Sequence, residues 1–488
     1  MLKLVRCLKD SLLRLSTYAP RMSTQRSHSP PTPSSSTSTD EPVAKRQRIE
    51  SGVADGESNG VNGSLAAEVP TKRKRTLPYE KGMHLAPMVR IGTLPVRLVS
   101  LEYGAELVWG PEIVDKAIIG SERRVDPKTG VVSFFKNNRS VFECHPIEKP
   151  RLIFQLGSAS PELAVQAMKM VENDVAGVGL NCGCPKSFSL SGGMGAALLK
   201  DPERLCSILK ALVGATDLPI DAKIRLLPKP ASSASASPAQ TPASPATPQD
   251  SAPASPSAAA PTPSAVLEPT EPLTITIPPT EHASPSEPTI PLVAQIFDTG
   301  IANLTVHCRT QEMRSREPAL HDRMRSITEM GRERGVPVVC NGDALGGGQE
   351  AKWGNFQELC EKTGVSSVMI ARAAEANPSC FASNGLEDPI KVVIPRLLRI
   401  AVATNNHYQN TKYILNAMDL YSSPTPPSRE VNRDLKQRMN KAKTYEDMCA
   451  IFGISEEEVK RIRETGVEEF VPGWVKRRKE IVEAEGEF

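Results

Sequence analysis

The sequence predicts an α/β protein: a TIM-type (β/α)8 barrel with a C-terminal helical domain and a long disordered insertion. Short apolar runs without alternation recur along the chain, and helix-period segments separate most of them. Such runs are typical of parallel strands that helices cover on both faces. Eight such units over about 290 residues match a (β/α)8 barrel. The predicted strands are His84–Met88, Glu106–Trp109, Leu152–Leu156, Gly177–Leu180, Ile220–Ile224, Asn303–His307, Val336–Cys340 and Ser367–Ile370.

The segments between the strands carry apolar residues at helical spacing. An open, doubly wound sheet is the alternative arrangement of the same elements. No Gly-x-Gly-x-x-Gly motif follows the first predicted strand, which weighs against a dinucleotide-binding Rossmann fold. The predicted helices are Pro161–Glu172, Pro202–Val213, Leu292–Thr299, Met324–Arg334 and Gln349–Lys362.

A change of composition interrupts the barrel pattern. Of the 43 prolines in the chain, 17 fall between Pro228 and Pro291, and Ala, Ser and Thr fill most of that stretch. A barrel connection tolerates such an excursion because loop-closure entropy grows only logarithmically with length. After Asp388 the chain becomes helical and polar. The predicted domains are a disordered basic tail, 1–79; the barrel, 80–387, interrupted by the insertion, 229–290; and a helical domain with a basic tail, 388–488.

The first 79 residues contain too few apolar side chains to form a core. Their basic runs, Lys45–Arg48 and Lys72–Arg75, are either nuclear-import signals or solvated charges. The first twenty residues resemble a mitochondrial presequence, which is lost if Met22 is the true start. We therefore expect a cytoplasmic or nuclear protein, or both, with mitochondria as the alternative if Met1 is the start.

Bulk composition excludes little about function. The 59 Lys and Arg against 56 Asp and Glu give a net charge of +3, so any case for nucleic acid must come from local clusters. Ten cysteines without a secretory signal favour a reduced compartment. Cys182 and Cys184 form the only close pair, so no zinc site is expected. No apolar run is long enough to predict a membrane span.

Polar or reactive residues stand at the same end of nearly every predicted strand. The carboxyl ends of the strands form the active-site face of such barrels, so these residues should lie close together. They are Ala86–Arg90 at the first strand, Gln155 at the third, Asn181–Lys186 at the fourth, Lys223–Arg225 at the fifth, His307–Arg309 at the sixth, Asn341–Asp343 at the seventh and Ala371–Arg372 at the eighth.

Three stretches of the chain resemble the tRNA-dihydrouridine synthases, most closely the eukaryotic position-20 subfamily. They are Leu85–Arg97 (Leu-Ala-Pro-Met-Val-Arg-Ile-Gly-Thr-Leu-Pro-Val-Arg), Val171–Gly177 and Gly192–Leu199. The resemblance covers about 83–228 and 292–420. It implies an FMN-dependent barrel that reduces uridine to 5,6-dihydrouridine in the D-loop of tRNA, with NADPH as the reductant.

FMN requires a phosphate cradle, polar partners for its ring edge and a protected reactive face. Loops after strands seven and eight commonly bind phosphate in barrels, where glycine permits close approach and arginine forks onto the phosphate oxygens. Lys223 is predicted to stabilise negative charge on the reduced ring, and Gln155 to bond the pyrimidine edge of the flavin. For each residue a purely structural role is the alternative. The predicted cofactor-binding residues are Pro87, Met88, Val89, Gln155, Lys223, His307, Asn341, Gly342, Asp343, Ala371 and Arg372.

Cys184 is predicted to be the catalytic residue. Saturating the uracil 5,6 bond requires a hydride at C6 and a proton at C5, and an ordinary thiol is mostly protonated at neutral pH. The resemblance places this acid at the cysteine of Asn-x-Gly-Cys-Pro, which is Cys184 and not Cys182. Nearby Lys186 or His307 would favour the thiolate, so the acid role requires that these cations be engaged elsewhere.

Contacts with tRNA are predicted at Lys186, at Arg309 and in the helical domain. Basic stretches at 429–443 and 476–479 either bind phosphates or form solvated helix faces. Animal relatives carry a double-stranded-RNA-binding domain here, and 421–488 lacks its signature. We expect a monomer without metal or membrane partners. The alternatives are a flavin barrel acting on a free pyrimidine and an inactive tRNA-binding scaffold.

Overall fold

The computed structural model describes residues 76–229, 287–344, 353–422 and 425–486, with backbone alone for 353–355. All of them belong to one structural unit, Thr71–Phe488. Residues 1–75 of the predicted basic tail and 230–286 of the predicted insertion lie outside the described residues. Residues 76–79, assigned to the tail from composition, belong to the fold, because Tyr79 is buried and its carbonyl accepts a hydrogen bond from the Ser367 hydroxyl at 2.6 Å. The four residues Glu287–Ile290, assigned to the insertion from composition, belong to the fold, because Glu287 is buried and helix α7 begins at Ile290.

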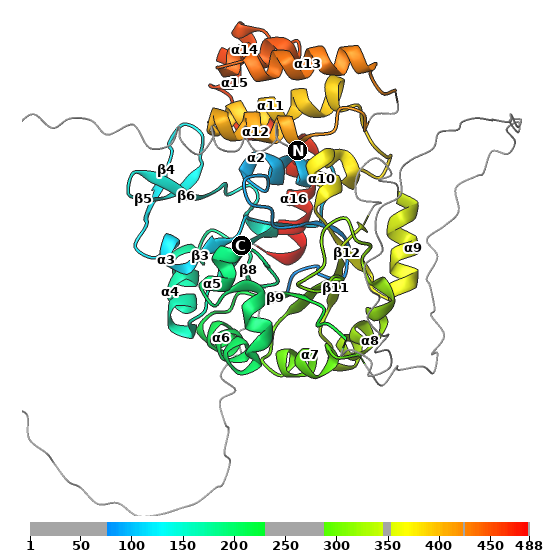
Figure 1. The fold of residues 1–488 in the computed structure, drawn as a ribbon. Coiled ribbons are helices and arrows are strands. Elements are labelled where there is room, and N and C mark those ends of the chain that lie inside the picture. The colour runs from blue at the N-terminus through cyan, green and yellow to red at the C-terminus, as the bar shows by residue number, and fades with distance from the viewer. Residues whose placement is uncertain (1–75, 230–286, 345–352, 423–424, 487–488) are drawn as a thin grey trace, which may run out of the picture. The chain divides into compact units, whose positions relative to one another are not determined.

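Eight parallel strands form a closed barrel (Figure 1). Their order around the barrel is β2-β1-β12-β11-β10-β9-β8-β7, and pairing of β2 with β7 closes it. This confirms the predicted (β/α)8 barrel. The strands are β1 (Gly82–Leu85), β2 (Leu107–Trp109), β7 (Leu152–Gly157), β8 (Gly177–Cys182), β9 (Ile220–Arg225), β10 (Asn303–His307), β11 (Val338–Asn341) and β12 (Ser367–Ile370).

The strand register places the predicted site residues at one level. Asn181 on β8 pairs with Lys223 on β9, and His307 on β10 pairs with both Arg225 on β9 and Asn341 on β11. The carboxyl ends of these four strands therefore form one continuous rim.

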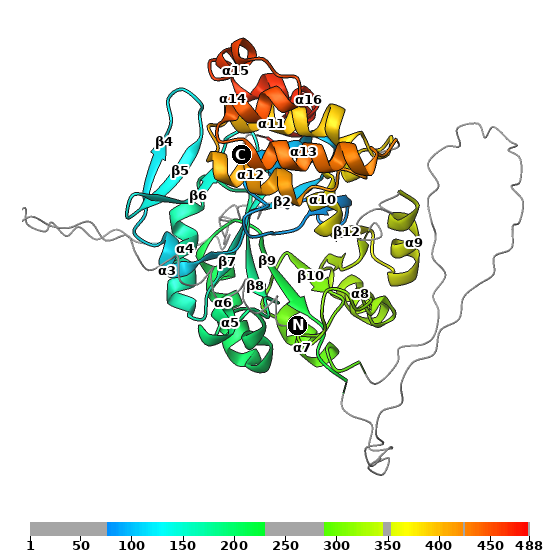
Figure 2. The ribbon, with the colours of Figure 1, turned by 45° about the horizontal axis from the view of Figure 1, so that its top comes forward.

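Helices pack against the outside of the barrel (Figures 1 and 2). Two of them begin in the same way: Ser160 and Asp201 accept backbone hydrogen bonds from Leu163 and Arg204, and a proline follows each cap. Both features favour a helix start. The helices in this layer are α2 (Leu94–Glu102), α4 (Pro161–Val171), α6 (Pro202–Ala215), α7 (Ile290–Phe297), α8 (Arg325–Arg334), α9 (Trp353–Thr363) and α10 (Arg372–Ala376).

A small antiparallel sheet follows the second barrel strand, where none was predicted. Strand β3 (Ile113–Val114) pairs with the end of β7, and helix α3 (Asp115–Ile118) leads into the sheet. Phe142 of the sheet meets the barrel residue Phe154 edge to face at 5.0 Å, which anchors the sheet on the barrel. Its strands are β4 (Glu122–Val125), β5 (Val132–Lys136) and β6 (Arg139–Cys144).

The C-terminal helices gather beside one end of the barrel (Figure 2). They adjoin the loop after β1, because Asn410 donates a hydrogen bond to the Arg90 carbonyl at 2.7 Å and the Arg90 guanidinium lies 3.9 Å from the centre of the Tyr413 ring. None of the described helices is long and apolar enough to cross a membrane. The helices are α11 (Ile394–Ala403), α12 (Tyr408–Ala417), α13 (Arg429–Lys441), α14 (Tyr445–Ile451), α15 (Glu456–Ile462) and α16 (Pro472–Glu485).

The last helix, α16, returns to the barrel. Trp474 is fully buried, and its indole N–H donates to the Ile147 carbonyl at 3.0 Å. Arg477 donates to the carbonyls of Leu101 and Ala105, both at 2.8 Å. The C-terminal segment is thus part of the packed fold, and Arg477 of the predicted basic tail serves that packing.

Candidate active site at the carboxyl ends of the strands

The carboxyl-terminal rim of the barrel carries the predicted site residues. Arg309, Asp343 and Arg372 are joined by ion pairs, and Cys184 and Lys223 lie close enough to interact electrostatically. His307 lies between these two sets of residues, because cations of both lie close enough to shift its pKa. The predicted residues are placed as follows: Pro87, Met88 and Val89 after β1, Gln155 in β7, Cys184 and Lys186 after β8, Lys223 in β9, His307 and Arg309 at the end of β10, Asn341, Gly342 and Asp343 at the end of β11, and Ala371 and Arg372 after β12.

A tight turn holds Cys184 at the end of β8. The Asn181 side-chain oxygen accepts hydrogen bonds from the backbone N–H groups of Gly183 at 3.0 Å and Cys184 at 3.1 Å. Asparagine commonly makes such turns with the backbone two residues on. Arg225 adds a bond from Nε to the Gly183 carbonyl at 2.8 Å. The backbone before the thiol is therefore fixed from two sides.

The glycine-rich loop 192–195 closes against Cys184. The Ala196 N–H donates to the Cys184 carbonyl at 3.0 Å. Gly195 has a φ of 59°, and a Cβ there would lie 2.7 Å from that carbonyl oxygen. Only glycine allows this approach. Helix α5 (Ser187–Ser191) precedes this loop, and the 3-10 helix η3 (Gly195–Lys200) begins at its last residue.

The two neighbouring cysteines differ in access. Cys182 lies within β8 and is fully buried, and burial raises the pKa of its thiol well above the usual range. Cys184 lies beyond the strand and is half-buried. The structure therefore leaves only the second thiol within reach of a substrate.

Gln155 is buried and Lys223 is half-buried, and neither side chain has a fixed partner. Burial lowers the pKa of Lys223 to about 8; the Arg225 charge acts in the same direction, whereas Asp221 and Cys184 oppose it. Among the described residues, neither the Lys223 ammonium nor the Gln155 amide makes a side-chain hydrogen bond. Both groups remain available to a ligand.

His307 stands among four cations. Burial lowers the pKa of His307 to about 2, and Lys223, Arg225, Arg309 and Arg372 act in the same direction. The imidazole is therefore neutral at physiological pH. Four positive charges around one neutral ring make this part of the rim attractive to an anion.

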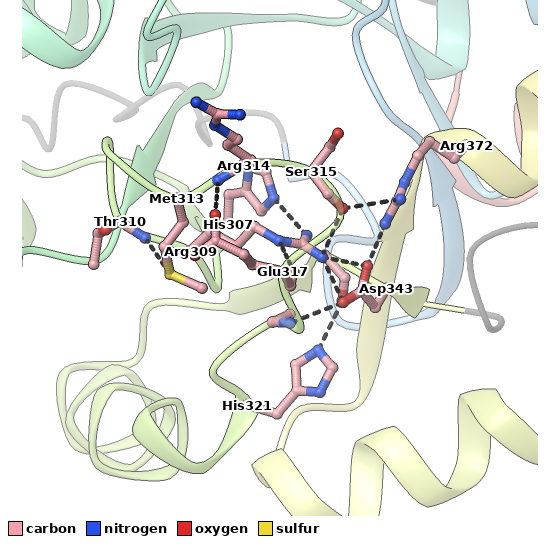
Figure 3. A network of polar contacts seen from close by, with 12 residues as sticks. His307, Arg309, Thr310, Met313, Arg314, Ser315, Glu317, His321, Asp343 and Arg372 are labelled. Atoms are coloured by element: carbon pink, nitrogen blue, oxygen red, sulfur yellow. Dashed lines mark hydrogen bonds and ion pairs between the residues drawn. The ribbon is translucent and has the colours of Figure 1, made fainter. Parts of the chain in front are cut away.

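Arg309, Asp343 and Arg372 form an ion-pair network (Figure 3). Arg309 Nη2 donates to both carboxylate oxygens of Asp343, at 2.6 and 2.5 Å, and Arg372 pairs with the same carboxylate. Although burial acts in the opposite direction, hydrogen bonds from Arg309 and Ala319 and the charges of Arg309 and Arg372 lower the pKa of Asp343. Asp343 is therefore ionised and orients both guanidinium groups.

The structure gives Arg309 an internal position. Its side chain is 4 % exposed, and Nε donates to the Glu317 carbonyl at 2.7 Å. Arg309 also lies 3.3 Å from His307 Nε2. Lys186, the other residue predicted to contact tRNA, is exposed. Of the two, only Lys186 presents its charge to the surface.

The turn after β11 requires glycine. Gly342 has a φ of 113°, and a Cβ there would come within 3.1 Å of the His307 ring and 3.3 Å of Ala319. Asp343 follows, also at positive φ. The Asn341 amide donates to the Met369 carbonyl on β12 at 2.8 Å, so that side chain joins two strands.

The loop after β1 has an open surface. Val89 is 49 % exposed and Met88 is half-buried, while the Met88 carbonyl accepts from Gly92 N–H at 2.8 Å. An apolar surface beside a polar rim fits the face of an aromatic ring system. The predicted packing role of Pro87, Met88 and Val89 stays a prediction.

Two charged residues contribute to the site in ways that were not predicted: Arg225 was expected on the rim without a role, and Glu112 was not expected there. Arg225 spans the loops after β8 and β10, because Nη1 also donates to the Thr310 carbonyl at 2.9 Å. Glu112 follows β2, for which no site residue was expected, and lies beside Cys184 and Asn181. The signal for Glu112 is its place a few residues after a barrel strand, a position that Cys184 and Arg372 share.

Behind the turn after β11, three potential metal ligands lie together. Ligand atoms of Cys308, His321 and Cys340 all lie within 4.8 Å of one another, and the two sulfur atoms are 3.6 Å apart. His321 Nε2 lies 2.7 Å from the Gly342 carbonyl. The expectation of no metal stays a prediction.

The basic stretch around α13 is divided between surface and packing. Lys436 donates to the carbonyls of Asn416 and Met418, at 3.0 and 3.1 Å, whereas Arg438 pairs with Asp434 on the exposed face.

Between α12 and the antiparallel sheet lies a cavity of about 1160 Å³. Its lining includes Arg124, Arg139, Asn405, Asn406, His407 and Asn410.

Comparisons with known proteins give one family. The model of the dihydrouridine synthase family matches residues 84–240 and 270–465. The tRNA-dihydrouridine(20) synthase [NAD(P)+] of Schizosaccharomyces pombe is 40% identical over 387 residues, 78% of this chain and 66% of that protein. Its Saccharomyces cerevisiae counterpart is 36% identical over 354 residues, 69% of this chain and 77% of that protein. A human tRNA-dihydrouridine(20a/20b) synthase [NAD(P)+]-like protein is 25% identical, over 63% of this chain and 73% of its own.

Proposed function

Because the chain belongs to the dihydrouridine synthase family, we propose that it reduces uridine to 5,6-dihydrouridine in the D-loop of tRNA. We propose FMN as its bound flavin and NADPH as its reductant, with position 20 as the target, as the names of the two yeast relatives suggest.

The observation that carries the proposal is the composition of the rim. A half-exposed thiol, a buried amide and a half-buried lysine lie at the same end of the barrel as a cluster of cations. Among the described residues, neither that amide nor that lysine makes a side-chain hydrogen bond. FMN is dianionic at its phosphate, and its reduced ring carries further negative charge. Such a ligand fits this donor set, since cations and free polar groups meet an anion and a heterocycle edge.

In this proposal each part of the rim has one role toward the flavin. Arg372, with the backbone of the turns at 341–343 and 371–372, holds the phosphate. Lys223 stabilises charge on the reduced ring, Gln155 bonds its pyrimidine edge, and His307 contacts it as a neutral imidazole. Pro87, Met88 and Val89 pack against the ring face. When bound, the flavin supplies the hydride that reaches C6 of the uracil.

Cys184 then supplies the proton. A uridine that is flipped out of its stack meets the half-buried thiol, whose Sγ–H gives its proton to C5 as the hydride reaches C6. The product is 5,6-dihydrouridine, and Cys184 is left as a thiolate that regains a proton from solvent. The turn at Asn181 fixes the thiol so that this transfer needs no backbone rearrangement.

The tRNA itself would contact surfaces around this rim. Lys186 lies two residues after the acid and is exposed. The helical domain adjoins the loop after β1 through Asn410. The cavity between α12 and the antiparallel sheet adds the basic residues Arg124 and Arg139. Arg309 supports the rim from inside through Asp343.

The test is a two-step measurement on the purified full chain. The protein should show flavin absorption, or gain it on addition of FMN, and NADPH should bleach that absorption without oxygen. A D-loop-containing tRNA transcript lacking dihydrouridine should then restore the colour and contain one dihydrouridine at position 20. Free uridine or orotate serves as the control. A protein that takes up no FMN, or is reoxidised only by a free pyrimidine, would overturn the proposal.

A further inference from the structure

Soft metal-binding side chains converge behind the turn after β11. Cys308 follows β10 and Cys340 lies in β11, and their sulfur atoms are 3.6 Å apart. A ring nitrogen of His321 lies within 4.8 Å of both sulfur atoms. Met324 Sδ lies 3.8 Å from Cys308 Sγ. The two thiols and the thioether are fully buried, and of the four side chains only His321 is partly exposed.

The main chain brings these donors together. The Cys308 N–H donates to the Asn341 carbonyl at 2.8 Å, and the Leu320 N–H donates to the Cys308 carbonyl at 2.6 Å. The second bond holds the start of the 3-10 helix η4 (His321–Arg323) against the end of β10. Side chains three residues apart eclipse one another on such a helix, so His321 and Met324 reach the same place. The backbone therefore fixes the cluster from three segments of the chain.

The hydrogen bond of His321 leaves the ring in the form that binds metals. Nε2 lies 2.7 Å from the Gly342 carbonyl oxygen. A carbonyl only accepts, so Nε2 carries the hydrogen, and in the neutral ring Nδ1 keeps its lone pair. Histidines that bind metals characteristically donate their other ring N–H to a carbonyl or carboxylate. The Gly342 carbonyl supplies such an acceptor.

We propose that Cys308, His321 and Cys340 bind a zinc ion. Tetrahedral Zn–S bonds of about 2.3 Å place two sulfur atoms about 3.8 Å apart, close to the 3.6 Å between these thiols. Binding releases the two thiol protons to solvent, and the two thiolates balance the charge of the buried dication. Met324 supplies a fourth, soft and weaker donor.

The position of the cluster defines what the ion does. It joins the end of the loop 310–320 to β10 and β11, and through His321 it reaches the Gly342 carbonyl in the turn 341–343. Four donors close the site, as in structural rather than catalytic zinc centres. The ion therefore stabilises this turn and takes no part in the chemistry. The inference does not depend on which flavin or substrate the protein binds.

The experiment measures the metal directly. Full-length protein made without a polyhistidine tag, and kept reduced, should contain about one zinc ion per chain by mass spectrometry of the elements. After zinc is removed with a chelator, Co²⁺ is added as the probe. A tetrahedral cobalt–thiolate site should absorb at wavelengths longer than the flavin bands.

Variants of single ligands locate the ion. Cys308→Ala and Cys340→Ala should lose both the zinc and the cobalt absorption. In His321→Gln the amide still donates to the Gly342 carbonyl but the ligating nitrogen is lost, so cobalt affinity should fall by about tenfold or more. Cys182→Ala, which removes another fully buried thiol of a barrel strand, should keep both signals.

Three results contradict the proposal. Wild-type protein that folds but holds neither zinc nor cobalt would show that the cluster is core packing. Copper in place of zinc would overturn the choice of ion. Cobalt absorption that survives in folded Cys308→Ala and Cys340→Ala would place the metal elsewhere in the chain.

Discussion

The two sides of the barrel rim are built on different principles. On the β10–β12 side, Arg309 and Arg372 both pair with Asp343 and both donate to backbone carbonyls. On the β7–β9 side, the described structure gives Gln155 and Lys223 no side-chain hydrogen bond and leaves Glu112 Oε1 without a partner. Unpaired buried polar groups cost stability. The β10–β12 side, the organised side, is therefore ordered before any ligand arrives. The β7–β9 side, the reserve side, keeps unpaired polar groups for a ligand.

The strongest test of this contrast is Cys184→Ala on the reserve side. The variant should bind FMN and be reduced by NADPH at wild-type rates, because neither step uses the thiol proton. Reoxidation by tRNA should slow by about 10² to 10⁴-fold, the usual effect of losing a positioned acid. Single-turnover absorbance at the flavin band measures it.

Cys182→Ala is the matched control, since Cys182 is buried within β8 and removed from the rim surface. It should reoxidise at nearly the wild-type rate. If Cys182→Ala is the impaired variant, the acid has been misassigned. If both variants react normally, the proton comes from another donor and the reserve side has no acid.

The organised side predicts a smaller effect for Arg372→Ala. Losing a charge-assisted contact to phosphate costs about 1.5–3 kcal/mol, and the side chain is 42% exposed, so we expect weakening of FMN binding by about 10- to 30-fold. Asp343 keeps its pairing with Arg309, so the fold should be unaffected. Fluorescence titration of the apoprotein with FMN measures the change.

Arg334→Ala provides the control, because Arg334, at the end of α8, forms an exposed ion pair with Asp298, which follows α7. Its FMN affinity should match the wild type. The FMN affinity of Arg372→Lys should lie between those of Arg372→Ala and the wild type, since lysine retains the positive charge but cannot make the two parallel hydrogen bonds of a guanidinium group. An unchanged affinity in Arg372→Ala would place the phosphate elsewhere on the rim.

The sequence predicted the barrel because its eight strands are apolar runs that are buried on both faces. It did not predict the antiparallel sheet, because β4 (Glu-Arg-Arg-Val) is exposed along its whole length and has no strand-like alternation. The docking of α16 was also missed, since one buried tryptophan sits among charged residues. These features depend on tertiary contacts that no local pattern encodes.

The site was predictable to the extent that topology determines it. Residues after parallel strands must share a rim, which brought Cys184, Lys223 and Arg372 to the same end. The inward turn of Arg309 was not predictable, because it depends on the loop at 310–320 folding back so that Ser315 and Glu317 accept its hydrogen bonds. The position of Glu112 on the rim was not predictable either, because it depends on the pairing of β3 with β7.

Below the reserve side, the barrel interior offers a pH test. Burial raises the pKa of Asp221 to about 8, although the Trp109 hydrogen bond and the Lys223 charge oppose this. The folded protein therefore holds a proton that the unfolded chain loses near pH 4. Stability from this group is fully present below about pH 4 and is lost as pH rises through 8.

Asp221→Asn mimics the neutral acid and removes this dependence. Its melting temperature relative to wild type should rise by about 5 °C between pH 5 and 8.5. Asp298→Asn, an exposed carboxylate paired with Arg334, should show a constant difference. If the melting temperatures of Asp221→Asn and wild type change in parallel with pH, Asp221 is ionised inside the barrel.

The smallest effect is expected where the chain passes from the reserve side to the organised side, between β9 and α7. Arg323 donates to the Leu227 carbonyl at 2.7 Å and to Glu287 at 2.7 and 2.5 Å, and Leu227 N–H donates to the Thr289 hydroxyl at 3.1 Å. The two ends of the insertion are thus held together by folded residues.

Deleting 232–284 should leave flavin binding unchanged and shift the melting temperature by less than about 2 °C, because the remaining residues easily span the gap. Deleting 232–288 also removes Glu287 and leaves Arg323, whose side chain is 9 % exposed, without its carboxylate partner, which should cost about 3–5 kcal/mol. Thermal melts of both variants measure the difference. Unfolding of the shorter deletion would show that the segment 232–284 itself packs on the barrel, and equal stability of the two would show that Arg323 does not depend on Glu287.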